Sequence, residues 1–245
     1  MTHPRFPDLR NLRDLGGLRT TDGLRVRRGR VFRSATPSFV DAQQARLLGE
    51  LLGIRTRIDL RSTVEIDEAP NQHLVAAGHA VEHLPLRAGG GWEAHPDLTD
   101  PNEAVAHHYT RYLEHSADSI AEIVRVAADP GRSPVLVHCS AGKDRTGVAL
   151  AVVLSAAGVA DDEIVADYAR TREDLDPLFA QLRLLPAYAT RLAALPEESF
   201  TADPRSMELF LARLRSEYGG ARRYLTGSGV DETTVDRLRR TLLEG

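Results

Sequence analysis

The sequence predicts an α/β protein whose central, mostly parallel sheet is flanked by helices and followed by a helical C-terminal region. Two patterns carry this prediction. Short apolar, β-branched runs alternate with helical patterns up to about residue 160, which is typical of parallel strands joined by crossover helices. From about residue 174 to 243 the pattern is helical, with breaks at Pro186, Pro196, Pro204 and Gly219-Gly220. No break in composition marks a second domain in the 245 residues, so we expect a single domain over residues 1–245.

The first half of the chain should place strands and helices in regular order. Residues 1–30 are rich in Arg, Gly and Asp and predict a loop, with a short hairpin near residues 21–23. Residues 31–34 should form a strand, and a helix should start at Ser38 or Asp41 and end at Gly53. Further strands are expected at 57–61, 80–86 and 135–138.

The later elements follow from similar signals. A glycine-rich loop at 87–101 should precede one long helix over residues 103–128, which Pro130-Gly131 would end. A further helix should begin at Asp161 or Asp162. The expected core thus spans about residues 1–172, and the helical part about 173–245.

One stretch, Val135–Gly147, organises the chain. A short valine-rich run typical of a buried strand leads into a polar loop, and an apolar helical run follows at 148–154. The loop starts with Cys139 and has Arg145 six positions later. Unpaired N–H groups and the positive end of the helix dipole make such a turn an anion site. The pattern therefore suits a phosphate group held above a sulfur nucleophile.

A Cys-x5-Arg match alone would mean little, because all but one of the 31 basic residues are arginine. A lone cysteine is also most often a small buried hydrophobe. The neighbouring residues favour a functional site: Gly142 and Gly147 permit close backbone approach, Thr146 could donate a hydroxyl to a thiolate, and Lys143 is the only lysine of the chain.

His-Cys-Ser-Ala-Gly-Lys-Asp-Arg-Thr-Gly, residues 138–147, resembles the phosphate-binding loop of the cysteine-dependent tyrosine phosphatases, and its Gly-Lys-Asp-Arg-Thr form is similar to a bacterial branch typified by a mycobacterial enzyme. Further similar stretches are Asn11–Gly17, Phe32–Ser34, Ile58–Ser62 and Asp167-Tyr168 with Thr171. The resemblance implies a protein tyrosine phosphatase-like fold with a helical lid in the C-terminal part. It also implies activity on phosphotyrosine and, as in some members, on phosphoserine, phosphothreonine or phosphoinositides.

The expected chemistry starts with Cys139, whose thiolate would attack phosphorus to form a phosphocysteine that water hydrolyses. Arg145 can bind two phosphate oxygens in fork geometry. The expected phosphate-binding set is Ser140, Ala141, Gly142, Lys143, Asp144, Arg145 and Thr146. This chemistry requires no cofactor and no metal ion. Lys143 would add a second cation at the rim, which makes phosphoinositides plausible substrates beside phosphoproteins.

The sequence leaves two assignments open, the identity of the general acid and the role of Arg61. The catalytic general acid is Asp144, which the family pattern favours, or Asp97, whose His95-Pro96-Asp97 setting resembles the mobile acid loop of the wider superfamily. Arg61, at the carboxyl end of its predicted strand, could help to form the anion pocket or could pair with Glu65 or Asp67.

Composition narrows the function classes. A net charge of −4 without basic clusters argues against nucleic-acid binding, and a single cysteine excludes an intramolecular disulfide. No apolar run is long enough to span a bilayer, and the N-terminus lacks a signal-peptide core, so we expect a cytoplasmic protein or one exported without a recognisable signal. The oligomeric state is not predicted. The rival interpretations are a phosphoprotein-binding module that has lost turnover and a sulfur- or arsenate-transferring enzyme.

Overall fold

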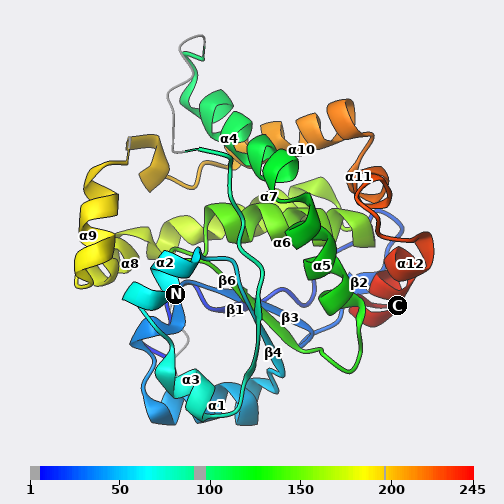
Figure 1. Cartoon of the computed structure of the whole chain (residues 1–245). Helices are drawn as coiled ribbons and strands as arrows, with labels where there is room; N and C mark the ends of the chain where they lie inside the picture. The colour runs from blue at the N-terminus through cyan, green and yellow to red at the C-terminus, as the bar shows by residue number, and fades with distance from the viewer. Residues whose placement is uncertain (1–5, 91–97, 196) are drawn as a thin grey trace.

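The computed structural model describes residues 6–90, 98–195 and 197–245. Its main sheet has the strand order β1-β3-β6-β4-β5, in which β1 is antiparallel to β3 and the other neighbours are parallel (Figure 1). The strands are β1 Arg13–Asp14, β3 Val31–Ser34, β6 Val135–His138, β4 Thr56–Asp59 and β5 Ala80–His83. The predicted mixed α/β class and mostly parallel sheet are confirmed.

Helices cover both faces of this sheet because its strands alternate between two apolar cores. In β3, Val31 belongs to one core and Phe32 to the other. The Phe32 side packs with α1 (Ala42–Leu52) and α3 (Gln72–Ala76), and α1 begins and ends as predicted, at Asp41 and Gly53. The short elements η1 (Pro37–Phe39) and α2 (Thr63–Glu68) flank this region and were not predicted.

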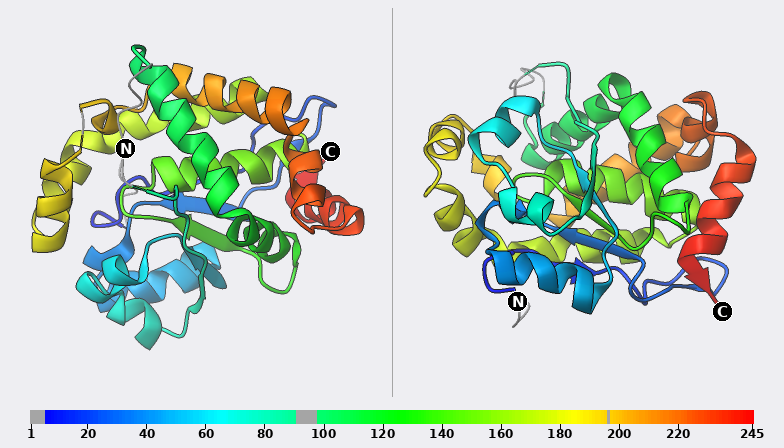
Figure 2. Two further views of the ribbon diagram at one scale, coloured as in Figure 1. Left: turned by 45° about the horizontal axis from the view of Figure 1, so that its top comes forward. Right: turned by 60° about the horizontal axis from the view of Figure 1, so that its bottom comes forward.

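The other core surrounds α6 (Asp144–Ala157), the helix that follows the Cys-x5-Arg loop. It packs against α4 (Pro101–His115), α5 (Ala117–Ala128) and α7 (Asp161–Ala169), as two further views show (Figure 2). Almost every residue of α6 is buried, which explains why its sequence is apolar around its whole circumference.

The single helix expected over residues 103–128 is in fact two helices. Ser116, with φ −138° and ψ 29°, separates α4 from α5. Its hydroxyl accepts a hydrogen bond from the N–H of Arg87 (2.7 Å) and donates one to the carbonyl of Arg87 (2.9 Å). Apolar residues continue through the break, so sequence periodicity does not reveal it.

The C-terminal part divides into two groups of helices. The first comprises η2 (Arg170–Asp174), α8 (Leu175–Leu182), α9 (Pro186–Ala193) and η3 (Glu197–Phe200), and α8 and α9 lie at one edge of the molecule in Figure 1. The second comprises α10 (Pro204–Tyr218), α11 (Ala221–Gly227) and α12 (Glu232–Leu242). The predicted breaks at Pro186, Pro204 and Gly219 are confirmed, whereas Pro196 lies outside the described residues.

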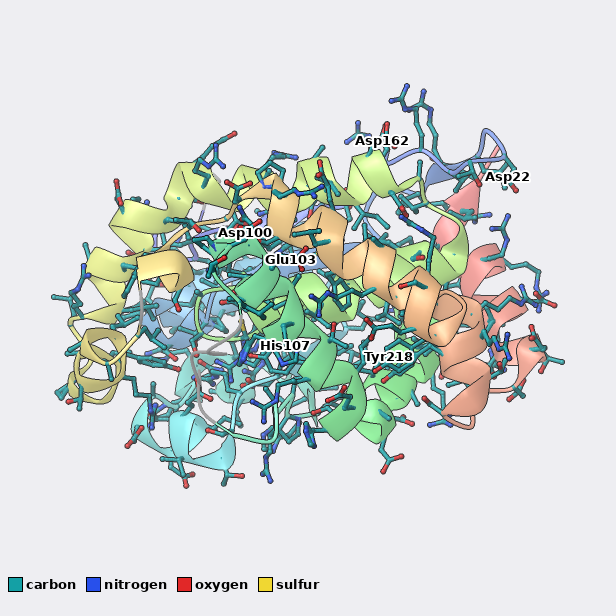
Figure 3. The ribbon with its side chains drawn as sticks, turned by 90° about the horizontal axis from the view of Figure 1, so that it is seen from above. Asp22, Asp100, Glu103, His107, Asp162 and Tyr218 are labelled. Atoms are coloured by element: carbon teal, nitrogen blue, oxygen red, sulfur yellow. The ribbon has the colours of Figure 1, made fainter. Side chains whose placement is uncertain are left out.

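The second group belongs to the body of the protein. The helix α10 packs along α4, where Arg213 pairs with Glu103 at 2.7 Å, and Figure 3 shows Glu103 facing α10. The helix α12 packs on α5 and α6, and the last strand, β7 (Leu243–Glu244), pairs with β2 (Arg25–Val26). Of the helical C-terminal part, residues 204–244 therefore pack on the body of the protein. None of the helices in the described ranges has both the length and the apolar composition needed to cross a bilayer.

The register of the sheet sets the position of the site. Ser34, His138 and Asp59 are neighbours at the carboxyl ends of β3, β6 and β4. The segments that follow them therefore meet at one edge of the sheet, which is where ligands gather in open α/β proteins.

Candidate active site

The loop from Cys139 to Arg145 curls around the sulfur of Cys139. The N–H of Gly142 donates to Sγ at 3.2 Å. Gly142 has φ +67°, and a Cβ at this position would lie 2.2 Å from the carbonyl oxygen of Ser34. Only glycine satisfies both constraints. Gly147 is also closely packed, since a Cβ there would lie 3.1 Å from the ring of Tyr168.

Residues far away in the sequence hold this loop from below. The side-chain amide of Asn11 donates to the carbonyls of Gly142 (3.0 Å) and Ala141 (3.3 Å), and Arg33 donates to the carbonyl of Gly142 at 2.7 Å. Arg33 and Arg13 both pair with Asp167 of α7 at 2.6 Å. Asn11 and Arg13 belong to the stretch Asn11–Gly17, for which the sequence offered only a resemblance to the family.

We call this buried group of Asn11, Arg13, Arg33 and Asp167 the loop support. Burial, together with the charge of Arg13, lowers the pKa of Arg33 to about 10 against the opposing attraction of Asp167. Burial alone would raise the pKa of Asp167, but Arg33 and Arg13 outweigh burial and hold that pKa below its usual range. Asp167 is therefore a carboxylate that neutralises the charge beneath the loop.

Arg145 is held by a carboxylate that sequence reasoning did not assign to it. Glu65 of α2 accepts from Nη1 at 2.7 Å and from Nη2 at 2.8 Å, and Nη2 also donates to the hydroxyl of Ser140 at 2.9 Å. Burial would raise the pKa of Glu65, but the charge and hydrogen bonds of Arg145, with the hydroxyl of Ser140, hold it well below its usual range. Ser62 and Glu65 form a capping box at the start of α2. This capping-box signal indicates where the helix begins, but it does not indicate that Glu65 binds the guanidinium group of Arg145.

Asp144 lies in the loop next to Arg145, at the N-terminus of α6. Its Oδ1 accepts from the hydroxyl of Tyr109 at 2.7 Å and lies 3.2 Å from Nζ of Lys143. The hydroxyl of Tyr168 lies 2.7 Å from that of Tyr109. The rival general acid, Asp97, and its neighbours His95 and Pro96 lie outside the described residues.

Lys143 does not stand at the rim as expected. Only 1% of its side chain is exposed, and Nζ donates to the carbonyls of Ser199 (2.6 Å) and Thr201 (2.7 Å). Its ammonium group is therefore directed to the backbone of η3 and of the residue after it. A buried ammonium group needs several acceptors, and this segment supplies them.

Two further expectations need correction. Arg61 is fully buried and pairs with Asp59 at 2.8 Å. It pairs with neither Glu65 nor Asp67 through their carboxylates. Nor is it among the described residues that line the cavity above the Cys139–Arg145 loop. Thr146 is also fully buried, and its hydroxyl has no hydrogen-bond partner in the described part of the chain. It therefore does not donate to the sulfur of Cys139.

A cavity of about 500 Å³ opens above the loop. Of the predicted site residues, those that line it are Cys139, Ser140, Ala141, Asp144 and Arg145. One wall comes from Glu65 and from His108 and Tyr112 of α4. The opposite wall is apolar and comes from α8, α9 and the segment after them, with Phe179, Leu182, Tyr188, Leu192 and Leu195. Within the C-terminal part, the residues that line the cavity thus fall between 179 and 199, and we call the segment 175–201 the cover.

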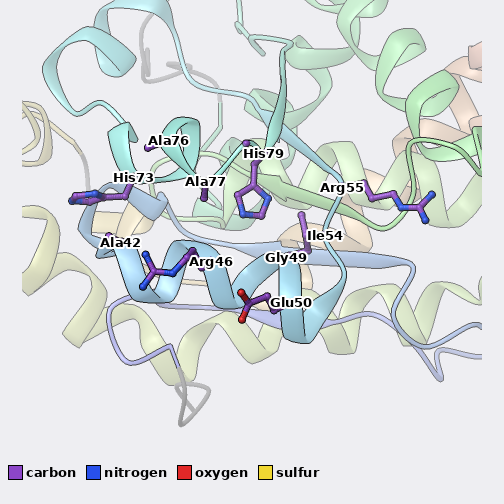
Figure 4. A pocket seen from close by; sticks show the side chains of 11 residues that line it. Ala42, Arg46, Gly49, Glu50, Ile54, Arg55, His73, Ala76, Ala77 and His79 are labelled. Carbon is purple, nitrogen blue, oxygen red and sulfur yellow. The ribbon is translucent and has the colours of Figure 1, made fainter.

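A second cleft, of about 680 Å³, is larger but lies elsewhere. It is lined by residues of α1 and α3 and their connections, with His79 between the two helices (Figure 4). The Nε2 atom of His79 bonds with the carbonyl of Ala45 at 2.8 Å, so this ring ties the connection between α3 and β5 to α1. No residue of the Cys139–Arg145 loop lines this cleft.

A thiol at the end of a parallel strand, an N–H group directed at its sulfur and an arginine on the first turn of the next helix define a class of proteins built around an anion-binding loop with a cysteine nucleophile. The chain belongs to the tyrosine phosphatase family, whose profile matches residues 4–244.

The comparisons with single proteins give two relatives and one solved structure. The chain is 31% identical to the triple specificity protein phosphatase PtpB of Mycobacterium tuberculosis, over 97% of this chain and 98% of that protein. It is 35% identical to a protein of Cupriavidus necator named as a tyrosine-protein phosphatase, over 69% of this chain and 62% of that protein's length. The solved catalytic core of Siw14 is similar at a TM-score of 0.37 and 14% identity, over 77% of this chain and 87% of that one.

Proposed function

We propose that this protein is a phosphomonoester hydrolase that removes phosphate from phosphotyrosine through a phosphocysteine intermediate on Cys139. The observation that carries the proposal is the sulfur of Cys139 at the floor of the cavity, with the N–H of Gly142 3.2 Å away and Arg145 on the cavity wall. This arrangement supports the proposal, because the N–H group of Gly142 donates to the sulfur and Arg145 is a cationic donor suited to phosphate.

The proposed reaction has two steps. The sulfur attacks phosphorus in line, the bond to the ester oxygen breaks, and Asp144 gives its proton to the departing oxygen. Water then attacks phosphorus, the bond to sulfur breaks, and Asp144 takes a proton from that water, so that inorganic phosphate and the thiolate are released. Loop N–H groups and Arg145 offset the charge on the phosphoryl oxygens in both steps.

Glu65 supports this role of Arg145. A guanidinium group has five N–H donors, and three of those of Arg145 go to Glu65 and Ser140. The other donors are available to phosphate, while the fork fixes the plane of the group. Preorganisation of this kind lowers the entropic cost of binding the transition state.

The cavity walls support an aryl phosphate as substrate. Phe179, Leu182 and Leu192 give an apolar surface suited to a phenol ring. Arg87 and Arg191 also line the cavity and suit acidic residues or additional phosphate groups. On this basis, and on the family resemblance, the proposal extends to phosphoserine, phosphothreonine and phosphoinositides as further substrates.

The test is kcat/KM measured side by side in EDTA on a phosphotyrosine peptide, a phosphoserine peptide and a short-chain phosphoinositide. We expect turnover of the phosphotyrosine peptide, and its complete loss in Cys139→Ser with peptide binding retained. Turnover by Cys139→Ser would exclude the phosphocysteine route. Binding of phosphate by the wild-type protein without turnover of any substrate would establish a phosphoprotein-binding module instead.

A further inference from the structure

We propose that Tyr109 is a positioning residue for proton transfer: with Lys143, it holds Oδ1 of Asp144 so that Oδ2 carries the proton to the leaving group. This inference rests on the proposed function, in which Asp144 is the general acid. It assigns a role to a buried tyrosine that the phosphate loop itself does not contain.

The two oxygens of Asp144 have different surroundings. Oδ1 accepts from the hydroxyl of Tyr109 at 2.7 Å and pairs with Nζ of Lys143 at 3.2 Å. Among the described residues no hydrogen bond or ion pair reaches Oδ2, and the side chain, 27% exposed, lines the cavity. In a protonated carboxyl group the oxygen that already accepts two donors is the poorer site for the proton. The proton therefore belongs on Oδ2.

Tyr109 is itself fixed on all sides. It is fully buried on α4, and its ring makes edge contacts with the rings of Tyr168 and Phe210 at centroid distances of 6.2 and 6.0 Å. Because its own proton goes to Asp144, Tyr168 is the donor in the hydrogen bond between the two hydroxyls. Burial, reinforced by the charge of Asp144, raises the pKa of Tyr109 well above its usual value. Tyr109 therefore keeps its proton and stays a donor at neutral pH.

Lys143 approaches the same oxygen from the other side. Its ammonium group is fixed by the carbonyls of Ser199 and Thr201, so its position is set by the end of the cover. The carboxyl group of Asp144 is thus held between α4 and the cover. Of the two anchors, Tyr109 is the better one to test, because removing its hydroxyl leaves the cover contacts intact.

The consequence is a dependence on the leaving group. An activated phenol such as p-nitrophenol leaves without a proton, whereas phenol itself, or a serine hydroxyl, leaves far better with one. A loss of positioning should therefore slow poor leaving groups much more than good ones. A merely structural defect would slow all substrates by the same factor.

The experiment compares kcat/KM of Tyr109→Phe and the wild type over aryl phosphates of graded leaving-group pKa, from p-nitrophenyl to phenyl phosphate. We expect a loss of about tenfold or more on phenyl phosphate, a part of the 10²–10⁴ that general acids contribute, with little change on p-nitrophenyl phosphate. Tyr224→Phe is the matched control, since Tyr224 is another buried tyrosine whose hydroxyl bonds to α4, at the carbonyl of Leu113 (2.8 Å). It should match the wild type on every substrate.

Asp144→Asn separates this inference from the function on which it rests. A steeper leaving-group dependence in both Asp144→Asn and Tyr109→Phe supports the inference. If Asp144→Asn steepens it but Tyr109→Phe lowers all rates equally or none, the positioning role is wrong and the general acid stands. If Asp144→Asn leaves the dependence unchanged, the assignment of the acid is wrong, and the inference fails with it.

Discussion

The loop support and the cover act on the same loop from opposite sides, but they are attached to it in different ways. Beneath the loop, Arg33 and Asp167 form a fully buried ion pair, and Arg33 also donates a hydrogen bond to the carbonyl of Gly142. Above it, the cover is joined through the ammonium of Lys143 and through an ion pair between Arg191 and Glu68, in which each side chain is 38% exposed. Buried charges that have lost their partner are costly, whereas exposed ones are rehydrated. The loop support should therefore govern the stability of the whole fold, and the cover only its own local stability.

The largest effect is expected from Asp167→Asn. It leaves Arg33 and Arg13 buried without a countercharge, and breaking a buried pair in this way costs about 3–5 kcal/mol of the free energy of unfolding. Glu68→Gln, the same kind of change on the cover side, should cost less than about 1 kcal/mol. Urea unfolding of both variants measures this difference. Equal losses would remove the distinction between the two regions.

Acid should destabilise the sheet beneath the loop through His138. Burial, together with Arg57, lowers the pKa of this ring to about 3, although Asp59 opposes the shift. The unfolded chain takes up the proton near pH 6.5, whereas the folded chain does so only near pH 3. Between these values the unfolded state binds more protons, so stability falls as the pH falls. One such histidine accounts for about 2 kcal/mol between pH 7 and pH 5.

The measurement for His138 is the slope of the free energy of unfolding against pH between 7 and 5. His138→Gln should lower this slope but not remove it, because burial also lowers the pKa of His108, to about 4, and that ring contributes in the same window. Glu65 and Asp167 contribute little to the slope between pH 7 and pH 5, because their pKa values are lowered. Their contribution to the free energy of unfolding is lost only as the pH falls through and below the ordinary carboxyl range. An unchanged slope in His138→Gln would show that the pKa of this ring is the same in the folded and unfolded protein, which would contradict its lowering by burial.

The sequence alone was sufficient for the parts of the fold that local signals encode. The strand before Cys139, the helix after it and the caps at Asp41 and Gly53 follow from hydrophobic periodicity and from residues with special backbone preferences. The break at Ser116 and the pairing of β7 with β2 did not follow, because each depends on a partner distant in sequence. Pairings of this kind are determined by tertiary packing and leave no local periodic signal.

The same limit applies to the candidate site, and two cations show it. Arg145 and Lys143 are two residues apart, and both looked like phosphate-binding groups. Arg145 lines the cavity because Glu65 meets it there, whereas Lys143 turns to the carbonyls of Ser199 and Thr201. Residue type indicated that both positions mattered, but the direction of each side chain depended on segments 56 to 80 residues away.

The smallest expected effect is on the cover, and Lys143→Met tests it. Methionine keeps the length of the buried stem but leaves the carbonyls of Ser199 and Thr201 without their charged donor. Such a hydrogen bond contributes about 1.5–3 kcal/mol, but the cover can open and rehydrate its carbonyls, so the loss should appear as local opening. Backbone amides in residues 199–203 should exchange with solvent about tenfold faster or more, while global stability changes little. Arg191→Met, which removes the exposed pair with Glu68, should leave exchange in these residues as in the wild type. If Lys143→Met instead lowers global stability as far as Asp167→Asn does, the cover is part of the same cooperative unit as the loop support, and the phosphate loop is held with equal strength from both sides.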